Sequence, residues 1–315
     1  MHDRNQREIC VLGLGLIGGS VLRGAIAAGW TGWAYNRSAV GADAARAEGY
    51  DADTDLARVL RRAADSDALI VLGVPMPAMD DVLAAVAAHA PDAALTDVVS
   101  VQGPLRPLVA RHGLSRRYVG SHPMAGSAAS GWAASTAELF TDAAWVVGCD
   151  DGADPAVWTR VARLALECGA VVVPAGSAEH DAAVARISHL PHLLAEALAL
   201  AGAAGGDLAL GLAAGSFRDG TRVAGSAPAL VRAMCEANAD ALLPTLDEAL
   251  QVLTDARDML ARDRSTAGLV EAGHAARQRY EQQQPWTISG IEPSDPDWLE
   301  RLREAGRRGG VLRAW

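Results

Sequence analysis

The chain has 315 residues, with 38 acidic and 28 basic side chains, a formal net charge of −10 and an apolar fraction of 50%. Its length is typical of two folded units with ample cores, and its negative charge argues against nucleic-acid binding, which requires a basic surface. The sequence contains no lysine, so every mechanism based on a lysine Schiff base or a lysine general acid is excluded.

The polar start of the chain and its cysteine spacing bear on location and redox state. The start of the chain, Met1 to Glu8, is polar, and no segment offers the roughly 18 consecutive apolar residues of a membrane span. The cysteines form no CxxC pair, which predicts buried, reduced thiols rather than disulfides or metal ligands. We expect a soluble cytoplasmic protein that binds neither nucleic acid nor a membrane.

From Ile9 to about Pro174, short apolar runs alternate with helical stretches, which predicts strand–helix units in a doubly wound parallel sheet. Each predicted strand is bounded by Gly, Pro, Asp or Ser. The predicted strands are residues 9–12, 31–35, 68–72, 94–98, 118–120, 144–147 and 170–173.

This alternation stops after Ser177, and the chain to about Gln282 has Ala and Leu at helical spacing, which predicts an all-helical domain. Residues 180–201 are predicted to form one long helix kinked at Pro191, and residues 242–260 form another. The second helix has an apolar stripe of Leu246, Leu250, Leu253, Met259 and Leu260. Helices this apolar need a partner surface, so we expect a homodimer formed through this domain.

The end of the chain is too short for a third domain. It is interrupted by Pro293 and Pro296, and its predicted helix runs from Trp298 to Arg308. We interpret it as a docking tail. The predicted organisation is an α/β domain at 1–177, an all-helical domain at 178–284 and a tail at 285–315.

A glycine-rich turn joins the first predicted strand to the first helix, with the sequence Gly13-Leu14-Gly15-Leu16-Ile17-Gly18. Glycine at 13 and 15 lets the backbone turn tightly and lets a pyrophosphate approach the amide groups at the helix start, and Gly18 lets helix and strand pack closely. In this context the GxGxxG pattern predicts a Rossmann-type site for NAD or NADP. A purely structural turn is the alternative.

The second predicted strand ends in Tyr35-Asn36-Arg37-Ser38, where NAD-binding domains carry an acidic residue for the ribose hydroxyls. Asn36 can bond a hydroxyl without repelling a phosphate, and Arg37 with Ser38 could hold the 2′-phosphate of NADP. Arg37 could instead stack on the adenine and select neither cofactor. The pattern favours NADP, with NAD as the alternative.

Two further loops follow strands at the edge where a cofactor crevice is expected. Val74 and Pro75 come after the strand at 68–72 and are predicted to contact the cofactor. Asp97 and Ser100 come at the end of the next strand. For Asp97 we predict a helix or turn cap.

A histidine follows the strand at 118–120, within Ser121-His122-Pro123-Met124-Ala125-Gly126-Ser127. This loop position places His122 where a substrate would meet the nicotinamide. An imidazole, with a reference pKa of about 6.5, is suited to take a proton from a carbinol as a hydride leaves. Ser100 is its predicted orienting partner, because both lie at strand carboxyl ends. The alternative is a loop histidine that only bonds backbone.

The helical domain carries two further polar motifs. In Ser188-His189-Leu190-Pro191-His192 the two histidines lie on one helical face. No third ligand has matching spacing, so a metal site is disfavoured, and both are predicted to hold a substrate group.

The second motif is Gly215-Ser216-Phe217-Arg218-Asp219-Gly220-Thr221-Arg222. Here Arg222 is the candidate clamp for a substrate carboxylate. Asp219 would orient His192 or cap a helix.

Taken in this order, these segments resemble the prephenate/arogenate dehydrogenase family of tyrosine biosynthesis. The resemblance covers roughly residues 8–282, and its most specific parts are SHPMAG at 121–126 and SHLPH at 188–192. It implies a Rossmann domain followed by a dimerising helical domain, with the active site between them.

The resemblance implies an oxidative decarboxylation, in which a hydride passes from the ring carbinol carbon of prephenate to NAD(P) and loss of carbon dioxide gives 4-hydroxyphenylpyruvate. In the family, the histidine matching His122 assists deprotonation of the ring hydroxyl, and the serine matching Ser100 orients it. The arginine matching Arg222 binds a substrate carboxylate near the position of His192. Ser127 is assigned to the same substrate pocket.

The chain departs from the family pattern at three positions. Many members carry a glutamate directly after the residue matching Ser127, where this chain has Ala128. Arogenate carries an ammonium where prephenate carries a keto group, so the missing carboxylate favours prephenate. Val231 stands where some relatives place an aromatic residue, and Asn36 where NAD-selective ones place Asp. The short tail leaves no room for the regulatory ACT domain of some members.

Other functions are left open by the residues. A sibling enzyme would act on arogenate or on 4-amino-4-deoxyprephenate. A β-hydroxyacid dehydrogenase of similar layout would use a catalytic lysine, which this chain lacks. A non-catalytic dinucleotide sensor would keep the glycine turn but need not keep His122 and Arg222.

Overall fold

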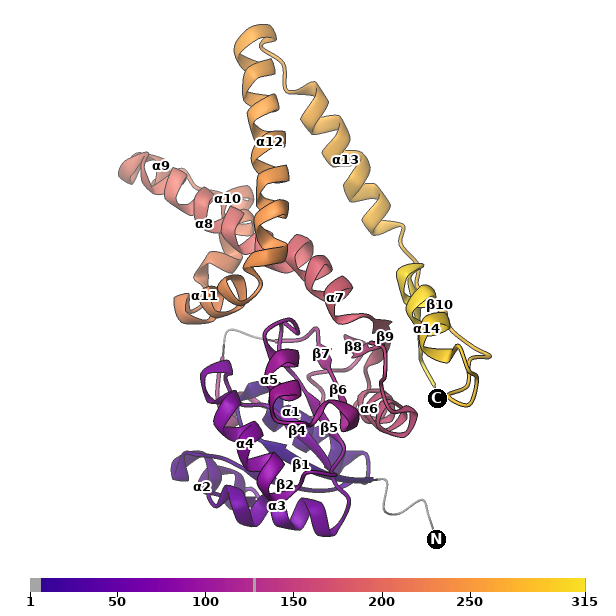
Figure 1. Ribbon diagram of the computed structural model, residues 1–315. Helices are drawn as coiled ribbons and strands as arrows, with labels where there is room; N and C mark the ends of the chain where they lie inside the picture. Colours follow the sequence, from indigo (N-terminus) through magenta and orange to yellow (C-terminus); the bar gives the residue numbers. More distant parts are fainter. Residues whose placement is uncertain (1–6, 127–128, 315) are drawn as a thin grey trace. The chain divides into compact units, whose positions relative to one another are not determined.

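The computed structural model describes residues 7–126 and 129–314 and is drawn in Figure 1. The chain divides into two compact units. Unit 1 comprises Met1–His180 and Trp286–Trp315, and unit 2 comprises Asp181–Pro285. The boundaries predicted from the sequence lie after residues 177 and 284, with the tail as a separate segment.

Unit 1 is built on a six-stranded parallel sheet with the strand order β3-β2-β1-β4-β5-β6. The strands are β1 (Glu8–Leu12), β2 (Thr31–Tyr35), β3 (Ala52–Asp53), β4 (Leu69–Leu72), β5 (Leu95–Asp97) and β6 (Tyr118–Val119). Ile9 of β1 lies opposite both Gly32 of β2 and Leu69 of β4. The strand order reverses between β1 and β4, and this is the place where open α/β sheets bind their ligands.

Helices cover both faces of this sheet (Figure 1). They are α1 (Leu16–Ala27), α2 (Ala39–Ala47), α3 (Leu56–Asp65), α4 (Met79–His89), α5 (Leu105–Arg111) and α6 (Pro155–Glu167). Successive side chains of a strand point to opposite faces, and Ile9 and Val11 accordingly belong to one buried apolar cluster while Cys10 and Leu12 belong to another. The sheet is therefore buried on both faces, which explains its continuous apolar strands.

A second sheet corrects the prediction of one continuous parallel sheet. It has three strands, β7 (Ser121–Pro123), β8 (Ala144–Gly148) and β9 (Val171–Ala175), and β7 runs antiparallel to β8. The predicted strands at 144–147 and 170–173 form here, outside the main sheet. The chain changes sheet at Gly120, whose carbonyl accepts a hydrogen bond from the Gly148 N–H and where a Cβ would lie only 2.3 Å from Oε1 of Gln102.

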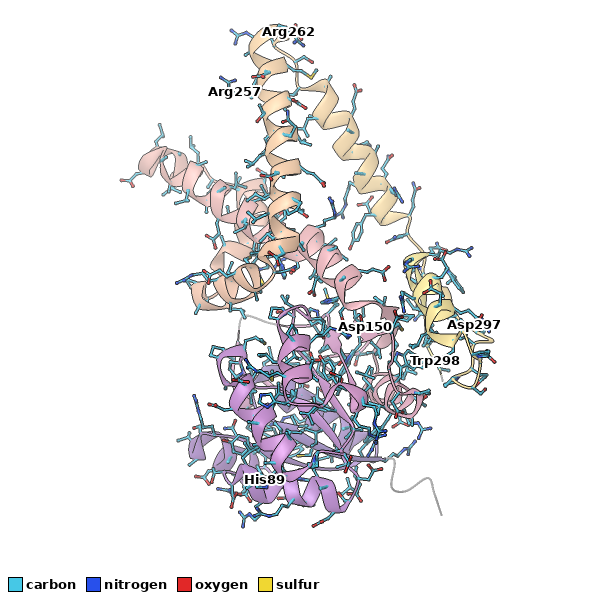
Figure 2. The ribbon with its side chains drawn as sticks, in the orientation of Figure 1. His89, Asp150, Arg257, Arg262, Asp297 and Trp298 are labelled. Carbon is cyan, nitrogen blue, oxygen red and sulfur yellow. The ribbon has the colours of Figure 1, made fainter. Side chains whose placement is uncertain are left out.

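The C-terminal segment packs onto this second sheet. It contains β10 (Trp286–Thr287), α14 (Trp298–Arg307) and β11 (Gly310–Val311). Leu312 pairs with Val172 of β9, and Trp298, labelled in Figure 2, packs edge-on against Trp158 with ring centres 5.5 Å apart. The segment predicted to be a docking tail is thus part of unit 1.

Unit 2 is helical, and α7 (Ser177–Val184) leads into it from unit 1. Its other α-helices are α8 (Leu190–Ala203), α9 (Gly206–Gly211), α10 (Gly215–Thr221), α11 (Pro228–Ala237), α12 (Ala239–Asp263) and α13 (Ala267–Glu281). Short 3₁₀ segments occur at Met76–Ala78, Ser115–Arg117, Trp132–Ala134 and Arg222–Gly225.

The single helix predicted for residues 180–201 is interrupted. Between α7 and α8 the chain forms a π-helical turn at Ala185–His189, which ends two residues before Pro191. Proline has no N–H, and its ring conflicts with the carbonyl four residues earlier. A π turn inserts one extra residue per turn and removes this conflict.

Burial differs between the units. The buried apolar cluster of unit 2 consists of Ala185, Val231, Cys235 and Leu242, while many of the unit's leucines are exposed. Cys10, Cys149, Cys168 and Cys235 are all buried, as predicted. No helix within the described residues is long and apolar enough to cross a bilayer.

Candidate functional site

The glycine turn between β1 and α1 has the geometry expected of a dinucleotide cradle. Gly13 has a positive φ of +109°, and a Cβ there would lie 2.5 Å from the carbonyl oxygen of Gly73; a Cβ on Gly18 would lie 2.0 Å from the carbonyl oxygen of Gly13. A Cβ on Gly15 would meet no atom within 4 Å. Gly13 and Gly18 are therefore required by packing, whereas Gly15 keeps open the approach to the start of α1.

The start of α1 offers donors to an anion. The helix begins at Leu16, and its N-cap residue, Gly15, supplies no side-chain cap. The first N–H groups of a helix have no partner within the helix, and they carry a partial positive charge. The backbone amides of Leu16 and Ile17 thus fit the pyrophosphate of a dinucleotide.

Asn36 ties the end of β2 to this turn. Its Oδ1 accepts a hydrogen bond of 3.1 Å from the Leu14 N–H, and its Nδ2 donates to the Ser38 carbonyl at 3.0 Å. Arg37 and Ser38 are exposed, and no ion pair of Arg37 occurs within the described part of the chain. Asn36 therefore has a structural role beside the predicted one toward the ribose, and Arg37 is available to a ligand.

The loop after β4 lies against the same turn. The Gly73 N–H donates to the Leu12 carbonyl at 2.8 Å. Val74 is half-buried against the apolar cluster that contains Leu12, and the exposed Pro75 precedes a 3₁₀ segment. This loop stands where the sequence predicted one wall of a cofactor site.

His122 belongs to a strand rather than to the loop predicted for it. It is the middle residue of β7, opposite Val146 of β8. It is half-buried, and its Nδ1 lies 2.9 Å from Nε2 of His180. The two rings are nearly perpendicular, at 86°, with centroids 5.1 Å apart.

His180 is the site residue that the sequence analysis missed. It lies in α7, is 3% exposed, and lines a small cavity together with His122, Gln102 and Ser177. Its 58-residue separation from His122 gave no motif to detect. The only signal was its position at the junction between the α/β and helical segments.

Ser100, the predicted orienting partner of His122, is not seen bonded to it. It lies in the loop after β5 and is half-buried. Its hydroxyl makes no hydrogen bond within residues 7–126 and 129–314, and the recorded partner of the His122 Nδ1 is His180. A role for Ser100 stays a prediction.

Asp97, at the end of β5, holds the strand that carries His122. Its carboxylate accepts hydrogen bonds from the Tyr118 hydroxyl (2.6 Å), Nε2 of Gln102 (3.0 Å) and the N–H groups of Val99 (2.9 Å) and Ser121 (3.2 Å). The bond to Val99 is the turn cap that the sequence predicted. Burial raises the pKa of Asp97 to about 6, although these donors favour the ionised form.

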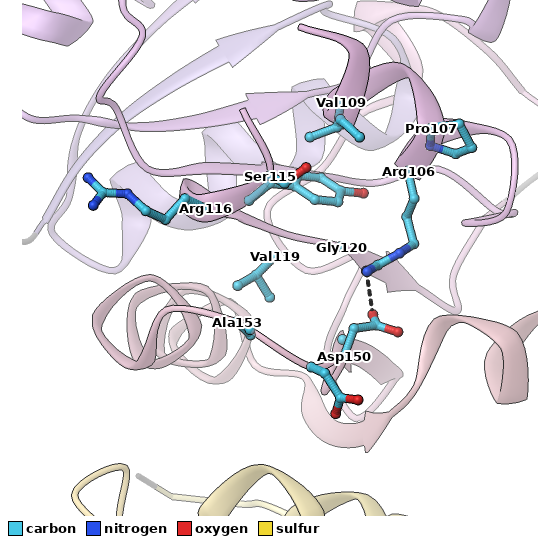
Figure 3. Close-up of a pocket in the computed structure, with 14 residues that line it drawn as sticks. Arg106, Pro107, Val109, Ser115, Arg116, Val119, Gly120, Asp150 and Ala153 are labelled. Atoms are coloured by element: carbon cyan, nitrogen blue, oxygen red, sulfur yellow. Dashed lines mark ion pairs between the residues drawn. The ribbon is translucent and has the colours of Figure 1, made fainter. Parts of the chain in front are cut away.

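A cavity of about 440 Å³ is lined by residues of α5, β6 and the loop after β8. Figure 3 draws the side chains that line it. Arg106 reaches across it to form an ion pair of 2.7 Å with Asp150. Ser115 and Tyr118 also line the cavity. No predicted site residue lies in it.

In unit 2 the two histidines of the 188–192 motif have different surroundings. His189 is 1% exposed and its Nδ1 lies 3.1 Å from Nδ2 of Asn238, a packing position. His192 is half-buried, and its Nδ1 lies 2.8 Å from the Ser188 carbonyl. A carbonyl only accepts, so His192 carries its proton on Nδ1 and presents Nε2 as an acceptor.

The arginine motif lies in α10 and the 3₁₀ segment after it. Arg218, Asp219 and Arg222 are exposed, and none forms an ion pair within the described residues. The N-cap of α10 is Ala214, so Asp219 does not cap that helix, and the structure records no bond from it to His192. Arg222 is free to bind an anion.

Comparison with known proteins decides the family. The model described as prephenate dehydrogenase, nucleotide-binding domain, matches residues 31–174, and that described as prephenate dehydrogenase, dimerization domain, matches residues 176–272. The cyclohexadienyl dehydrogenase of Zymomonas mobilis is 34% identical over 265 residues, which cover 81% of this chain and 89% of that protein. The chain belongs to the prephenate dehydrogenase family.

Two solved structures of similar proteins agree with this assignment. One, from Corynebacterium glutamicum and provisionally described as a prephenate dehydrogenase, is 49% identical with a TM-score of 0.93, covering 98% of this chain and 99% of that one. The other, Synechocystis arogenate dehydrogenase, is 29% identical with a TM-score of 0.74, covering 87% of this chain and 99% of that one.

Membership of the prephenate dehydrogenase family confirms three predictions: the family resemblance, the Rossmann-type domain followed by a helical domain, and the dehydrogenase class. The relatives are named for different substrates, so membership does not select one. Ser127 and Ala128, which bear on that choice, lie outside the described residues. Within the described ranges, no group of three or more His, Cys, Asp or Glu side chains is placed to hold a metal.

Proposed function

We propose that this protein is a prephenate dehydrogenase, which couples NAD(P)-dependent oxidation of the prephenate ring carbinol to loss of carbon dioxide and gives 4-hydroxyphenylpyruvate. The observation that carries the proposal is the half-buried His122, held by a second imidazole. It lies in the same unit as a glycine turn that fits a dinucleotide. An imidazole so placed is a general base for a carbinol.

In this reaction the protein must accept one proton from the substrate. Nε2 of His122 takes the proton of the ring hydroxyl as the C–H hydride departs, and a bound nicotinamide supplies the hydride acceptor. The C–C bond to the ring carboxylate then breaks, and its electron pair enters the ring. The ring becomes aromatic, and the former carbinol oxygen, now a phenolate, takes up a proton to give the phenol. The driving force of aromatisation makes the overall step irreversible once carbon dioxide has left.

Binding of the substrate falls to groups of unit 2 in this proposal. Arg222 has an exposed guanidinium with no ion pair among the described residues, and guanidinium groups bind carboxylates through two parallel hydrogen bonds. His192 presents Nε2 as an acceptor, which suits a substrate hydroxyl. Ser100, Ser127 and Asp219 are retained as further candidate contacts, whereas the burial of His189 favours a role in packing.

Prephenate is preferred over arogenate because residue 128 is alanine. Many family members carry glutamate there, and its carboxylate would pair with the arogenate ammonium. Without that carboxylate, an ammonium at this position would lose a charged partner, which costs more than the loss of a neutral contact. Arogenate and 4-amino-4-deoxyprephenate are the alternative substrates.

For the cofactor we propose NADP, with NAD as a second substrate. Asn36 replaces the acid that would repel a 2′-phosphate, and its oxygen already accepts the Leu14 N–H. Arg37 is exposed and without an ion pair in the described chain, so it can pair with that phosphate.

We also propose that the protein acts as a homodimer assembled through unit 2. The unit matches a dimerization-domain model and leaves large apolar side chains exposed on α8, α9 and α12. Such surfaces are costly in water and are typical of subunit interfaces.

The test is the initial rate of nicotinamide reduction with prephenate or arogenate, each crossed with NAD or NADP. We expect the highest kcat/KM with prephenate and NADP. A clear preference for arogenate would replace the substrate, and no turnover in any mixture would overturn the proposal and favour the amino-substituted substrate or a dinucleotide sensor.

The Arg37→Ala variant tests the cofactor preference separately from the substrate preference. The KM for NADP should rise by about tenfold, since one charge-assisted pair is lost, while the KM for NAD stays unchanged. Equal changes for both cofactors would mean that Arg37 stacks on the adenine and does not select.

A further inference from the structure

We propose that His180 is the positioning residue that holds His122 in the tautomer required of a general base. The inference rests on the proposed function, in which Nε2 of His122 accepts the proton. It starts from the 2.9 Å contact between Nδ1 of His122 and Nε2 of His180.

A hydrogen bond between two neutral imidazoles has two arrangements. If His180 donates, the proton of His122 resides on Nε2, and that nitrogen has no lone pair to accept a proton. If His122 donates through Nδ1, its Nε2 carries the lone pair and can act as a base. His180 therefore serves the reaction only as the acceptor, with its own proton on Nδ1.

The same bond strengthens when His122 becomes charged. As Nε2 takes the substrate proton, the ring becomes an imidazolium, and its Nδ1–H donates to a neutral acceptor. Hydrogen bonds to charged groups are about twice as strong as neutral ones. His180 thus stabilises the protonated state formed during the reaction, in addition to fixing the tautomer before it.

His180 is held by a rigid frame. The N–H of Ser177 donates to Oδ1 of Asp150 at 3.0 Å and its hydroxyl to Oδ2 at 2.6 Å, and Asp150 is paired with Arg106. The His180 N–H donates to the Gly176 carbonyl at 2.9 Å. The first turn of α7 is therefore fixed to the loop after β8.

The C-terminal segment fixes the other side of that turn. Oε2 of Glu179 accepts the Gly176 N–H at 3.1 Å, and its Oε1 is paired with Arg307 of α14. α14 itself packs tightly on β9, since a Cβ on Gly306 would lie 1.9 Å from the Pro174 carbonyl oxygen. The position of His180 thus depends on two ion pairs from separate parts of unit 1.

The charged groups around the imidazole pair are already engaged. Asp150 pairs with Arg106, and Glu179 pairs with Arg307. Asp97 lies behind Gln102, whose Nε2 donates to it, and the neighbouring Asp181 of α7 is buried. The pH response of the site therefore reports on the imidazole pair together with Asp97, whose pKa burial raises to about 6.

Two variants separate positioning from packing. His180→Leu removes the acceptor and keeps an apolar side chain, while His180→Gln places an amide oxygen near the position of Nε2. His89→Leu, at the end of α4 and labelled in Figure 2, is the control for loss of a histidine elsewhere in unit 1. Each is compared with wild type by pH–rate profile and thermal melting.

His180→Leu should lower kcat by about tenfold or more, because the base is no longer oriented, with the KM for the cofactor unchanged. The acid limb of its pH–rate profile should move to lower pH by about one unit, because the protonated His122 loses the acceptor of its Nδ1–H. His180→Gln should restore most of the rate and the wild-type limb, and His89→Leu should match wild type.

An unmoved acid limb in His180→Leu, or equal losses in the leucine and glutamine variants, would overturn the proposal. A ¹⁵N NMR measurement of the His122 tautomer tests it without any turnover. Wild type should carry the proton on Nδ1 and His180→Leu should show a mixture. If wild type fails to oxidise any of the substrates, the proposed function fails while the tautomer measurement still decides the role of His180.

Discussion

The two units bury their apolar residues to different extents. In unit 1, side chains on both faces of β1 lie in large buried clusters, and even the C-terminal segment adds Trp298 and Leu302 to the core. In unit 2 the corresponding cluster has four buried members. Leu200, Leu208 and Leu212 are more than 70% exposed, at 71%, 75% and 74%.

This difference in burial indicates that the two units have different roles. Unit 1 buries its own sheet and also carries the candidate base and the dinucleotide cradle. Unit 2 leaves many of its large apolar side chains exposed, which is the pattern expected of the homodimer proposed above. A variant in unit 1 should therefore change chemistry or local stability, whereas one on α12 should change assembly.

The largest expected effect is in unit 1. His122→Asn removes the general base and should lower kcat by about a thousandfold, within the range for acid–base catalysis. Asparagine keeps a polar group in β7, and dinucleotide affinity and thermal melting should stay near wild type. A variant with wild-type-like turnover would remove His122 from the mechanism.

The next effect is on assembly through unit 2. Leu250 and Leu253 are 52% and 50% exposed on α12, and changing both to glutamate should weaken the homodimer by about a thousandfold, since two apolar side chains and two charges are involved. Light scattering coupled to gel filtration measures it. Asp255→Arg, on the opposite face of the same helix, is the control and should remain dimeric; a dimeric double variant would place the interface elsewhere.

A third prediction concerns pH. The pKa of Asp97 is raised to about 6 in the folded state, so its contribution to stability is fully present below its unfolded value of about 3.9 and is lost as pH rises through 6. As the pH rises from 4 to 7.5, the free energy of unfolding of the Asp97→Asn variant should therefore rise relative to that of wild type, by up to about 3 kcal/mol. Urea titration checks this, with the exposed Asp92→Asn as control, and a pH-independent difference would contradict it.

The smallest effect is on substrate binding by unit 2. Arg222→Ala should raise the KM for prephenate by about thirtyfold, the equivalent of about 2 kcal/mol for a hydrogen bond to a charged group, with a smaller change in kcat. Arg218→Ala, one helical turn earlier in the same motif, should have little effect. The reverse pattern would move the carboxylate clamp to Arg218.

Local sequence patterns predicted most of unit 1. The strands at 9–12 and 31–35 and the glycine turn were predictable because their apolar residues and glycines act on immediate neighbours. The separate second sheet was not, since it depends on Gly120 packing against Gln102 and on β7 pairing with β8 across a long loop. A strand pattern does not specify which sheet the strand joins.

The site shows the same limit. His122 was identifiable from its motif, whereas His180, which the structure brings to its Nδ1 from α7, belongs to no motif. The orienting role of Ser100 stays a prediction. The π turn at Ala185–His189 likewise depends on how Pro191 is accommodated. The sequence predicted one helix kinked at Pro191, but not the π turn before it. The spacing of residues in the sequence does not predict contacts between distant segments.

The most direct test of the account is the stoichiometry of the reaction. Purified protein is given prephenate and the preferred nicotinamide cofactor, and reduced cofactor, carbon dioxide and 4-hydroxyphenylpyruvate are measured in the same samples over time. Equal amounts of all three are expected. Reduced cofactor without carbon dioxide, or no reduction at all, would contradict an oxidative decarboxylation of prephenate.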